Sequence, residues 1–207
     1  ISEVADVEAI HVAREFARQR LADELFEPLW QRYQDARVQS RQSVYVAQAE
    51  HFARRALQNM ALSYLMLSGQ PKVLAACLEQ YEACDNMTER LAALAVLVNS
   101  PFEAEKSAKL ESFALQFKDN PLVMDQWFSV QAACTQPGGL ERVQGLMQHP
   151  AFTLKNPNKV RALIGAFAGQ NLINFHRADG SGYRFLADLV ITLNALNPQI
   201  AARQLSP

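Results

Sequence analysis

Four prolines in this chain each follow a short polar residue, and apolar residues at helical spacing follow each proline. An Asn or Ser side chain just before a helix accepts a hydrogen bond from a backbone N–H that would otherwise be unpaired. Proline suits the first helical position because its missing N–H has no partner there. The four pairs therefore predict helix starts, and they are Ser100-Pro101, Asn120-Pro121, Asn156-Pro157 and Asn197-Pro198.

Other breaks in the apolar pattern predict further helix ends. Asn86 and Glu89 have the spacing of a capping box, and Gly69 follows an apolar run as a helix-ending glycine. Pro28 should start or kink the helix that contains it. The alternation typical of strands is absent. We expect helices at residues 6–19, 21–36, 45–68, 72–83, 87–99, 101–117, 121–134, 139–148, 157–169 and 182–195, with another beginning at 198.

The expected helix at 45–68 is amphipathic. Phe52, Leu57 and Met60 fall on one broad face, and Arg55 and Gln58 lie towards the other. Aromatic residues of the other helices also recur at helical spacing and are expected in the core. They are Trp30, Tyr33, Phe113, Phe117, Trp127 and Phe128.

The spacing of the helix starts predicts the architecture. Starts near residues 87, 121, 157 and 198 lie 34 to 41 residues apart, about one helix pair each. This is the approximate period of an α-solenoid, in which each pair buries its apolar face against the next pair. The units share no clean repeat signature. We therefore predict an all-α fold: an irregular HEAT-like α-α superhelix of about ten antiparallel helices, forming a single helical domain over residues 1–207.

Composition excludes several classes of protein. The formal net charge of the 207 residues is −1, and Lys and Arg are interspersed with acids, so no basic face for nucleic acid is indicated. The longest apolar runs, such as Leu91–Val98, are far shorter than the roughly 20 residues of a membrane span. Three cysteines without CxxC spacing suggest reduced, structural thiols and a cytoplasmic location. Residues 1–10 do not resemble a signal peptide.

No pattern in the sequence indicates a catalytic or metal site. The four histidines lie far apart, and the HExxH pattern of zinc peptidases does not occur. The glycines around Ser181 lack the lysine of a phosphate-binding loop, and a tight turn before the next helix explains them better. Carboxylate pairs are interleaved with Lys and Arg, as on a solvated surface. We expect no catalytic residue, no metal ligand and no cofactor in this segment.

The last third of the chain carries a family resemblance. Residues 156–203 read NPNKVRALIGAFAGQNLINFHRADGSGYRFLADLVITLNALNPQIAAR. This stretch resembles the C-terminal helical domain of the bacterial aminopeptidase N branch of the zinc aminopeptidases. Similar likenesses are found at Asn86-Met87-Thr88, at 122–128 and at 145–149. Over the first 40 residues the likeness is limited to the helical pattern.

The resemblance implies a function for the chain. Members of this family hold zinc through HExxH and a downstream Glu in an earlier domain, next to a GAMEN loop, and neither motif occurs here. Their helical domain closes over the catalytic domain and forms a chamber that admits short peptides. By motif position, two arginines that face the chamber correspond to Arg161 and Arg203. The implied partners are the catalytic domain of the same polypeptide and short peptide substrates.

The family continues through more basic helices, so the chain is expected to be a fragment truncated at both ends, inactive alone, with an exposed apolar face that favours self-association. Arg161 and Arg203 could instead be ordinary exposed helix arginines. The alternative function is a stand-alone α-solenoid scaffold that binds a protein or peptide.

Overall fold

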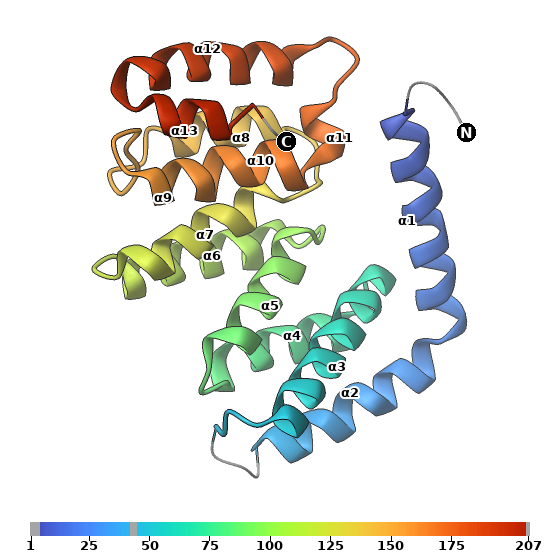
Figure 1. The fold of residues 1–207 in the computed structure, drawn as a ribbon. Helices are drawn as coiled ribbons and strands as arrows, with labels where there is room; N and C mark the ends of the chain where they lie inside the picture. Colours follow the sequence, from blue (N-terminus) through green and yellow to red (C-terminus); the bar gives the residue numbers. More distant parts are fainter. Residues whose placement is uncertain (1–4, 42–44, 206–207) are drawn as a thin grey trace. The chain divides into compact units, whose positions relative to one another are not determined.

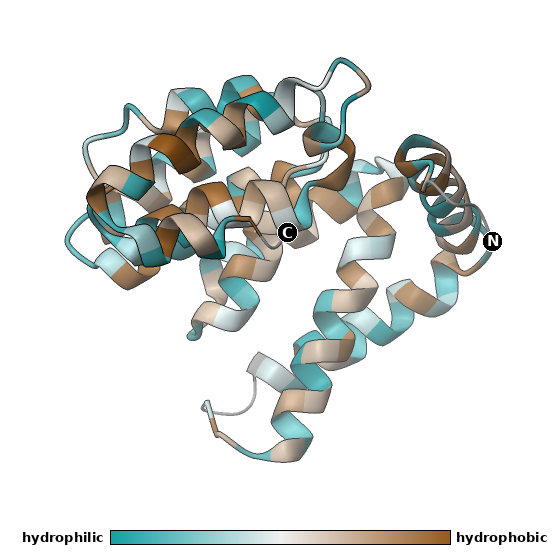
Figure 2. Cartoon of the chain, turned by 45° about the horizontal axis from the view of Figure 1, so that its top comes forward, coloured by the Kyte–Doolittle hydropathy of each residue, from teal (hydrophilic) through white to brown (hydrophobic). Residues whose placement is uncertain are grey.

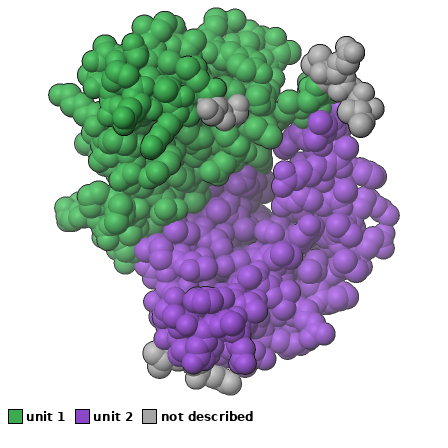
Figure 3. Space-filling model, in the orientation of Figure 1, with its two compact units in different colours: residues 1–8, 110–207 green, residues 9–109 purple. Residues whose placement is uncertain are grey.

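The computed structural model describes residues 5–41 and 45–205, and within these ranges the regular structure is helical (Figure 1). The predicted all-α class is confirmed. The chain divides into two compact units, residues 9–109 and residues 1–8 with 110–207, which Figure 3 colours separately.

Unit 2 (residues 9–109) consists of helical hairpins. Its helices are α1 (Val7–Glu24), α2 (Phe26–Arg41), α3 (Ala49–Leu65) with a terminal 3-10 turn η1 (Met66–Ser68), α4 (Pro71–Ala83), α5 (Met87–Val98) and the start of α6 (Glu103–Phe117). α2 packs along α3, α4 along α5, and α3 also contacts α5 (Figure 1). The core between them contains Leu62, Leu65, Cys77, Leu94 and Leu97.

Unit 1 (residues 1–8 and 110–207) has buried phenylalanines in its core. It contains α7 (Pro121–Ala132), α8 (Gly139–Leu146), α9 (Pro157–Val160), the π-helical turn η2 (Arg161–Gly165), α10 (Ala166–Gln170), α11 (Leu172–Phe175), α12 (Ser181–Leu196) and α13 (Pro198–Arg203). Phe128, Phe167 and Phe175 are almost fully buried. Phe167 meets Phe175 edge-to-face, which joins α10 to α11.

The predicted caps form. Asn86, Asn120, Asn156 and Asn197 each accept a hydrogen bond from a backbone N–H in the first turn of α5, α7, α9 and α13, respectively. Gly69 has φ +64°, the left-handed conformation expected of a helix-ending glycine. The asparagine-proline pairs therefore mark helix starts correctly.

Ser100-Pro101 does not start a helix, because α6 begins two residues later at Glu103. The Ser100 hydroxyl donates to the carbonyl of Leu97 at 2.7 Å and accepts from the N–H of Phe102 at 3.3 Å. This side chain therefore closes α5 and forms the turn that follows, so it does not cap α6.

Pro28 explains where the first two helices separate. The sequence predicts the break near residue 20, but α1 continues to Glu24 and α2 begins at Phe26. Pro28 has no N–H to donate to the carbonyl of Glu24, four residues earlier, and its ring crowds that carbonyl. The helix therefore breaks one turn before the proline, which lies in the first turn of α2.

The aromatic core predictions are largely confirmed. Tyr33, Phe113, Trp127 and Phe128 are buried, and Trp30 and Phe117 are partly buried. The predicted helix at 157–169 is composite, because a π-helical turn separates α9 from α10. No pattern in the sequence indicated that turn or the short helix α11.

α3 begins at Ala49, later than predicted, and between Phe52 and Met60 its burial is the reverse of what its amphipathic pattern suggests. Arg55 and Gln58 are buried, and Phe52, Leu57 and Met60 are exposed. The sequence identified the two faces correctly. It could not show which of them the neighbouring helices cover.

Candidate substrate-facing surface

The first candidate arginine lies at the start of the π-helical turn. Asn156 caps α9 by accepting from the N–H of Asn158 at 2.9 Å. The side chain of Asn158 in turn accepts from Nη2 of Arg161 at 2.7 Å. The guanidinium is exposed, and this bond restricts it to the start of the helix. The cap residue therefore fixes the helix start, and the residue two positions later orients the arginine.

Lys159, two residues before Arg161, has a structural role. Its side chain is buried, with Nζ 2.8 Å from Oδ1 of Asp125, and it donates to the carbonyl of Pro121 at 3.0 Å. Nζ also lies 5.4 Å from the centre of the Phe128 ring. This cation therefore joins α9 to α7 and is unavailable to a ligand, whereas Arg161 points to solvent.

The π-helical turn from Arg161 to Gly165 separates the exposed arginine from the core. A π-helical turn adds a residue to the helical repeat, and such turns are common at functional sites. Ala162, Leu163 and Ile164 are buried behind Arg161, and the carbonyl of Ala162 accepts from the hydroxyl of Ser129 at 2.9 Å. Arg161 is thus an exposed side chain on a firmly packed turn.

The second candidate arginine lies at the end of α13. Asn197 accepts from the N–H groups of Gln199 and Ile200, at 3.1 and 3.3 Å. Ile200 is buried in unit 1, and Arg203 is exposed. The same Asn-Pro element therefore starts both helices that carry a candidate arginine.

The two helices meet at Gly165. A Cβ on this glycine would lie 3.6 Å from Oε1 of Gln204 and 3.7 Å from Cγ of Arg161. Gln204 is buried and directly follows Arg203 in the chain. The structure therefore brings together two motifs that lie far apart in the sequence, and each motif carries an exposed arginine.

The chemistry of this surface is that of anion or carbonyl recognition. A guanidinium remains charged at any physiological pH and can hold a carboxylate with two parallel hydrogen bonds. Within the part of the chain that the structure describes, neither arginine forms an ion pair with a carboxylate. Both charges are available to a ligand.

No metal-binding cluster accompanies these arginines. Among residues 5–41 and 45–205, no group of three or more His, Cys, Asp or Glu side chains could hold a metal ion. The described residues therefore do not fit zinc. The same part of the chain has no helix long and apolar enough to cross a membrane.

Helical hairpins with capped helix starts are typical of helical repeat proteins of the α-solenoid class. A family model described as a domain of unknown function (DUF3458_C) with ARM repeats matches residues 1–207. The chain belongs to this family. ARM repeats are α-solenoid units, which agrees with the predicted superhelix.

The relatives are aminopeptidases. Aminopeptidase N of Escherichia coli is 38% identical over 205 residues, which are 99% of this chain and 23% of that protein. Aminopeptidase N of Haemophilus influenzae is 37% identical over 202 residues, 98% of this chain and 22% of that protein. A crystal structure of Legionella pneumophila aminopeptidase A in complex with aspartic acid matches with a TM-score of 0.85 and 31% identity, over 97% of this chain and 24% of that one.

The chain spans less than a quarter of the length of these relatives. It corresponds to a C-terminal helical domain of aminopeptidase N, which confirms the resemblance found in the sequence.

Proposed function

We propose that this chain forms the helical wall of the substrate chamber in a cytoplasmic bacterial zinc aminopeptidase. The catalytic domain of the same polypeptide would hold the zinc and hydrolyse the N-terminal peptide bond. Cys77, Cys84 and Cys134 are buried and do not take part in disulfides, which supports a reducing compartment. The aminopeptidase relatives support the reaction class.

One observation supports a binding role for the wall. The motifs that carry Arg161 and Arg203 meet where Gly165 contacts Gln204, and both arginines are exposed. A pair of cations on one surface can attract the C-terminal carboxylate of a short peptide. Such attraction would draw the far end of the substrate away from the metal while its amino terminus reacts.

Steady-state kinetics of the full-length enzyme would test this role. We expect Arg161→Ala to raise KM for tripeptides by about tenfold, the equivalent of one charge-assisted hydrogen bond of about 1.4 kcal/mol. KM for a single-residue aminoacyl reporter should not change, because that substrate is too short to reach the wall. Arg203→Ala should act in the same direction.

Arg184→Ala is the matched control, since Arg184 is an exposed arginine of the same unit whose guanidinium bonds to the carbonyl of Asp179. Equal kinetics of the Arg161 variant on both substrates would remove that residue from the binding role. Absence of any peptidase activity in the full-length protein would favour the stand-alone scaffold.

A further inference from the structure

Between Phe52 and Met60, α3 buries a polar side and exposes an apolar side, and further along the helix the buried side carries Ala61, Leu62 and Leu65. Gln58 is 0% exposed and Arg55 is 4% exposed, whereas Phe52, Leu57 and Met60 are 50, 48 and 59% exposed. Ala53 and Ala56 are also exposed between them. We call these five apolar residues, from Phe52 to Met60, the α3 apolar face. Their positions recur at the spacing of one helical side, so they form a continuous stripe.

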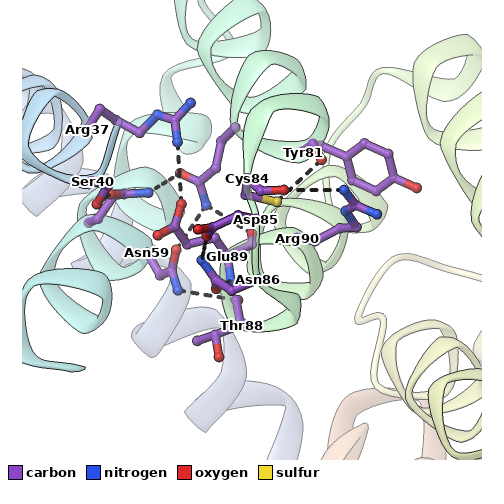
Figure 4. A network of polar contacts seen from close by, with 12 residues as sticks. Arg37, Ser40, Asn59, Tyr81, Cys84, Asp85, Asn86, Thr88, Glu89 and Arg90 are labelled. Atoms are coloured by element: carbon purple, nitrogen blue, oxygen red, sulfur yellow. Dashed lines mark hydrogen bonds and ion pairs between the residues drawn. The ribbon is translucent and has the colours of Figure 1, made fainter. Parts of the chain in front are cut away.

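Hydrogen bonds to neighbouring helices fix this orientation of α3. Gln58 donates to the side chain of Gln80 in α4 at 3.0 Å and accepts from the hydroxyl of Ser40 in α2 at 3.1 Å. Gln80 also donates to the carbonyl of Glu89 in α5 at 3.0 Å. Asn59 accepts from Gln80 at 2.9 Å, and Figure 4 shows Arg37, Ser40, Asn59 and Glu89 converging there.

α3 therefore cannot rotate about its axis to bury its apolar side in place of its polar side. Turning α3 would leave these buried amides without partners, at a cost of about 1–3 kcal/mol for each group. Helices α2, α4 and α5 occupy the polar side of α3, and the opposite side remains bare over its first half.

α1 covers the C-terminal end of the bare side. The guanidinium of Arg18 lies 5.7 Å from the centre of the Tyr64 ring, and Gln19 donates to the carbonyl of Leu67 at 3.4 Å. Tyr64 and Leu67 continue the stripe that begins at Phe52, one to two helical turns beyond Met60. The first helix of the chain therefore lies on the same side of α3 as the exposed face.

α1 is itself almost uncovered. Of its eighteen residues only Ala22 is buried, and Ile10, Val12 and Phe16 are 60, 61 and 67% exposed. Figure 2 shows hydrophobic residues, in brown, along this helix. A single helix of this length is marginally stable in water without tertiary packing. We therefore expect the same further polypeptide to pack against both α1 and the α3 apolar face.

We propose that the polypeptide preceding this segment in the full-length aminopeptidase docks on the α3 apolar face and α1. The relatives are more than four times as long as this chain, so most of their length lies outside it. The helices that follow α3 occupy its polar side, and α1, through which any preceding chain must enter, lies on the bare side. This inference rests on the proposed function and names the surface that contacts the catalytic part.

Thiol labelling of the full-length protein tests the proposal. Met60→Cys and Leu57→Cys each place a thiol on the α3 apolar face, and Ile191→Cys on α12, at a residue 72% exposed, serves as the matched control. The native thiols of Cys77, Cys84 and Cys134 are buried and contribute little background. We expect a maleimide to modify the two α3 variants at least about tenfold more slowly than the control at every protein concentration.

Two results would overturn the proposal. Labelling as fast as at the control position would show that nothing covers this face. Protection that disappears on dilution, together with a dimer in sedimentation velocity, would show that a second copy is the occupant. Two α3 variants guard against misfolding at one position. Peptidase kinetics of the same proteins test the proposed function separately from the docking proposal. If Arg161→Ala had no effect on KM for tripeptides, the labelling rates at the α3 apolar face would be unchanged.

Discussion

His149 lies among aromatic rings in unit 1. Its ring centre is 5.1 Å from that of Trp127 and 5.6 Å from that of Phe128, and Nδ1 accepts from the N–H of Ala151 at 3.1 Å. Burial lowers the pKa of His149 below its usual value, and the positive charge of Lys159 lowers it further. The folded protein therefore favours the neutral imidazole, which keeps Nδ1 available as an acceptor.

Stability should consequently fall as the solution becomes acidic. The unfolded chain takes up a proton on His149 near its ordinary pKa of 6.5, before the folded chain does, so protons favour unfolding below that pH. We expect Tm to decline between pH 7 and pH 5, and His149→Gln to flatten this decline in calorimetry. His11→Gln on α1 is the control. Parallel curves for the wild-type protein and the His149 variant would contradict the assignment.

The buried ion pair of unit 2 offers a second test at single residues. Nη1 of Arg37 lies 3.4 Å from Oε2 of Glu89, and both side chains are more than nine-tenths buried. Removing one partner leaves an uncompensated buried charge. We expect Arg37→Met to lower the free energy of unfolding by about 3–5 kcal/mol in urea titrations, and Glu89→Met to do the same.

The double variant distinguishes the pair from simple loss of packing. Arg37→Met combined with Glu89→Met should lose much less than the sum of the single changes, because neither charge then remains buried alone. Strictly additive losses would mean that the two side chains do not interact across the 3.4 Å.

At this scale the sequence predicted only part of the candidate surface. The resemblance singled out Arg161 and Arg203, and both are exposed. Whether Lys159 or Arg161 faces solvent could not be read from the motif, because it depends on Asp125 in another helix. The meeting of Gly165 with Gln204 likewise depends on packing between helices that are distant in sequence.

At the scale of elements, the sequence predicted helix starts correctly where an asparagine side chain caps the helix through hydrogen bonds to nearby backbone groups. Asn86 and Asn156 accept first-turn N–H groups as their positions predict. The failures have another origin. The burial of α3 depends on where α2, α4 and α5 lie, and the π-helical turn η2 lies within a run of ordinary helix-forming residues. Neither is encoded by neighbours in the chain.

The junction of α11 and α12 depends on one glycine. A Cβ on Gly182 would lie 2.1 Å from the carbonyl oxygen of Phe175, and that backbone cannot easily move because Phe175 is buried. Gly145 in α8 has nothing within 4 Å of the corresponding position. Gly182→Ala should therefore lower the free energy of unfolding by about 3 kcal/mol, at the upper end for overpacking.

Gly145→Ala is the matched substitution and should raise the free energy of unfolding by about 0.4–1 kcal/mol, because alanine restricts the unfolded chain. Urea titrations of the two variants compare the effects directly. A Gly182 variant as stable as the wild-type protein would mean that α12 can shift away from Phe175 without cost.

At the scale of the molecule, the period of the helix starts predicted the solenoid class but not its exposed surfaces. A solenoid helix is buried on both sides only if neighbours exist on both sides. α3 has neighbours on its polar side, and α1 has very few. Residues that an amphipathic pattern assigns to a core are therefore exposed in this chain.

A chain of these 207 residues should self-associate through that exposed surface. Apolar residues of α1 and α3 lie in water, and pairing two copies would remove them from it. We expect the sedimentation coefficient to rise with protein concentration. Leu57→Lys with Met60→Lys should abolish the rise, because both side chains are about half exposed and a charge there opposes burial. Leu115→Lys, at a residue 71% exposed on α6, should leave association unchanged. A wild-type chain that stays monomeric at all concentrations would contradict the prediction, as would equal effects of the α3 and α6 substitutions.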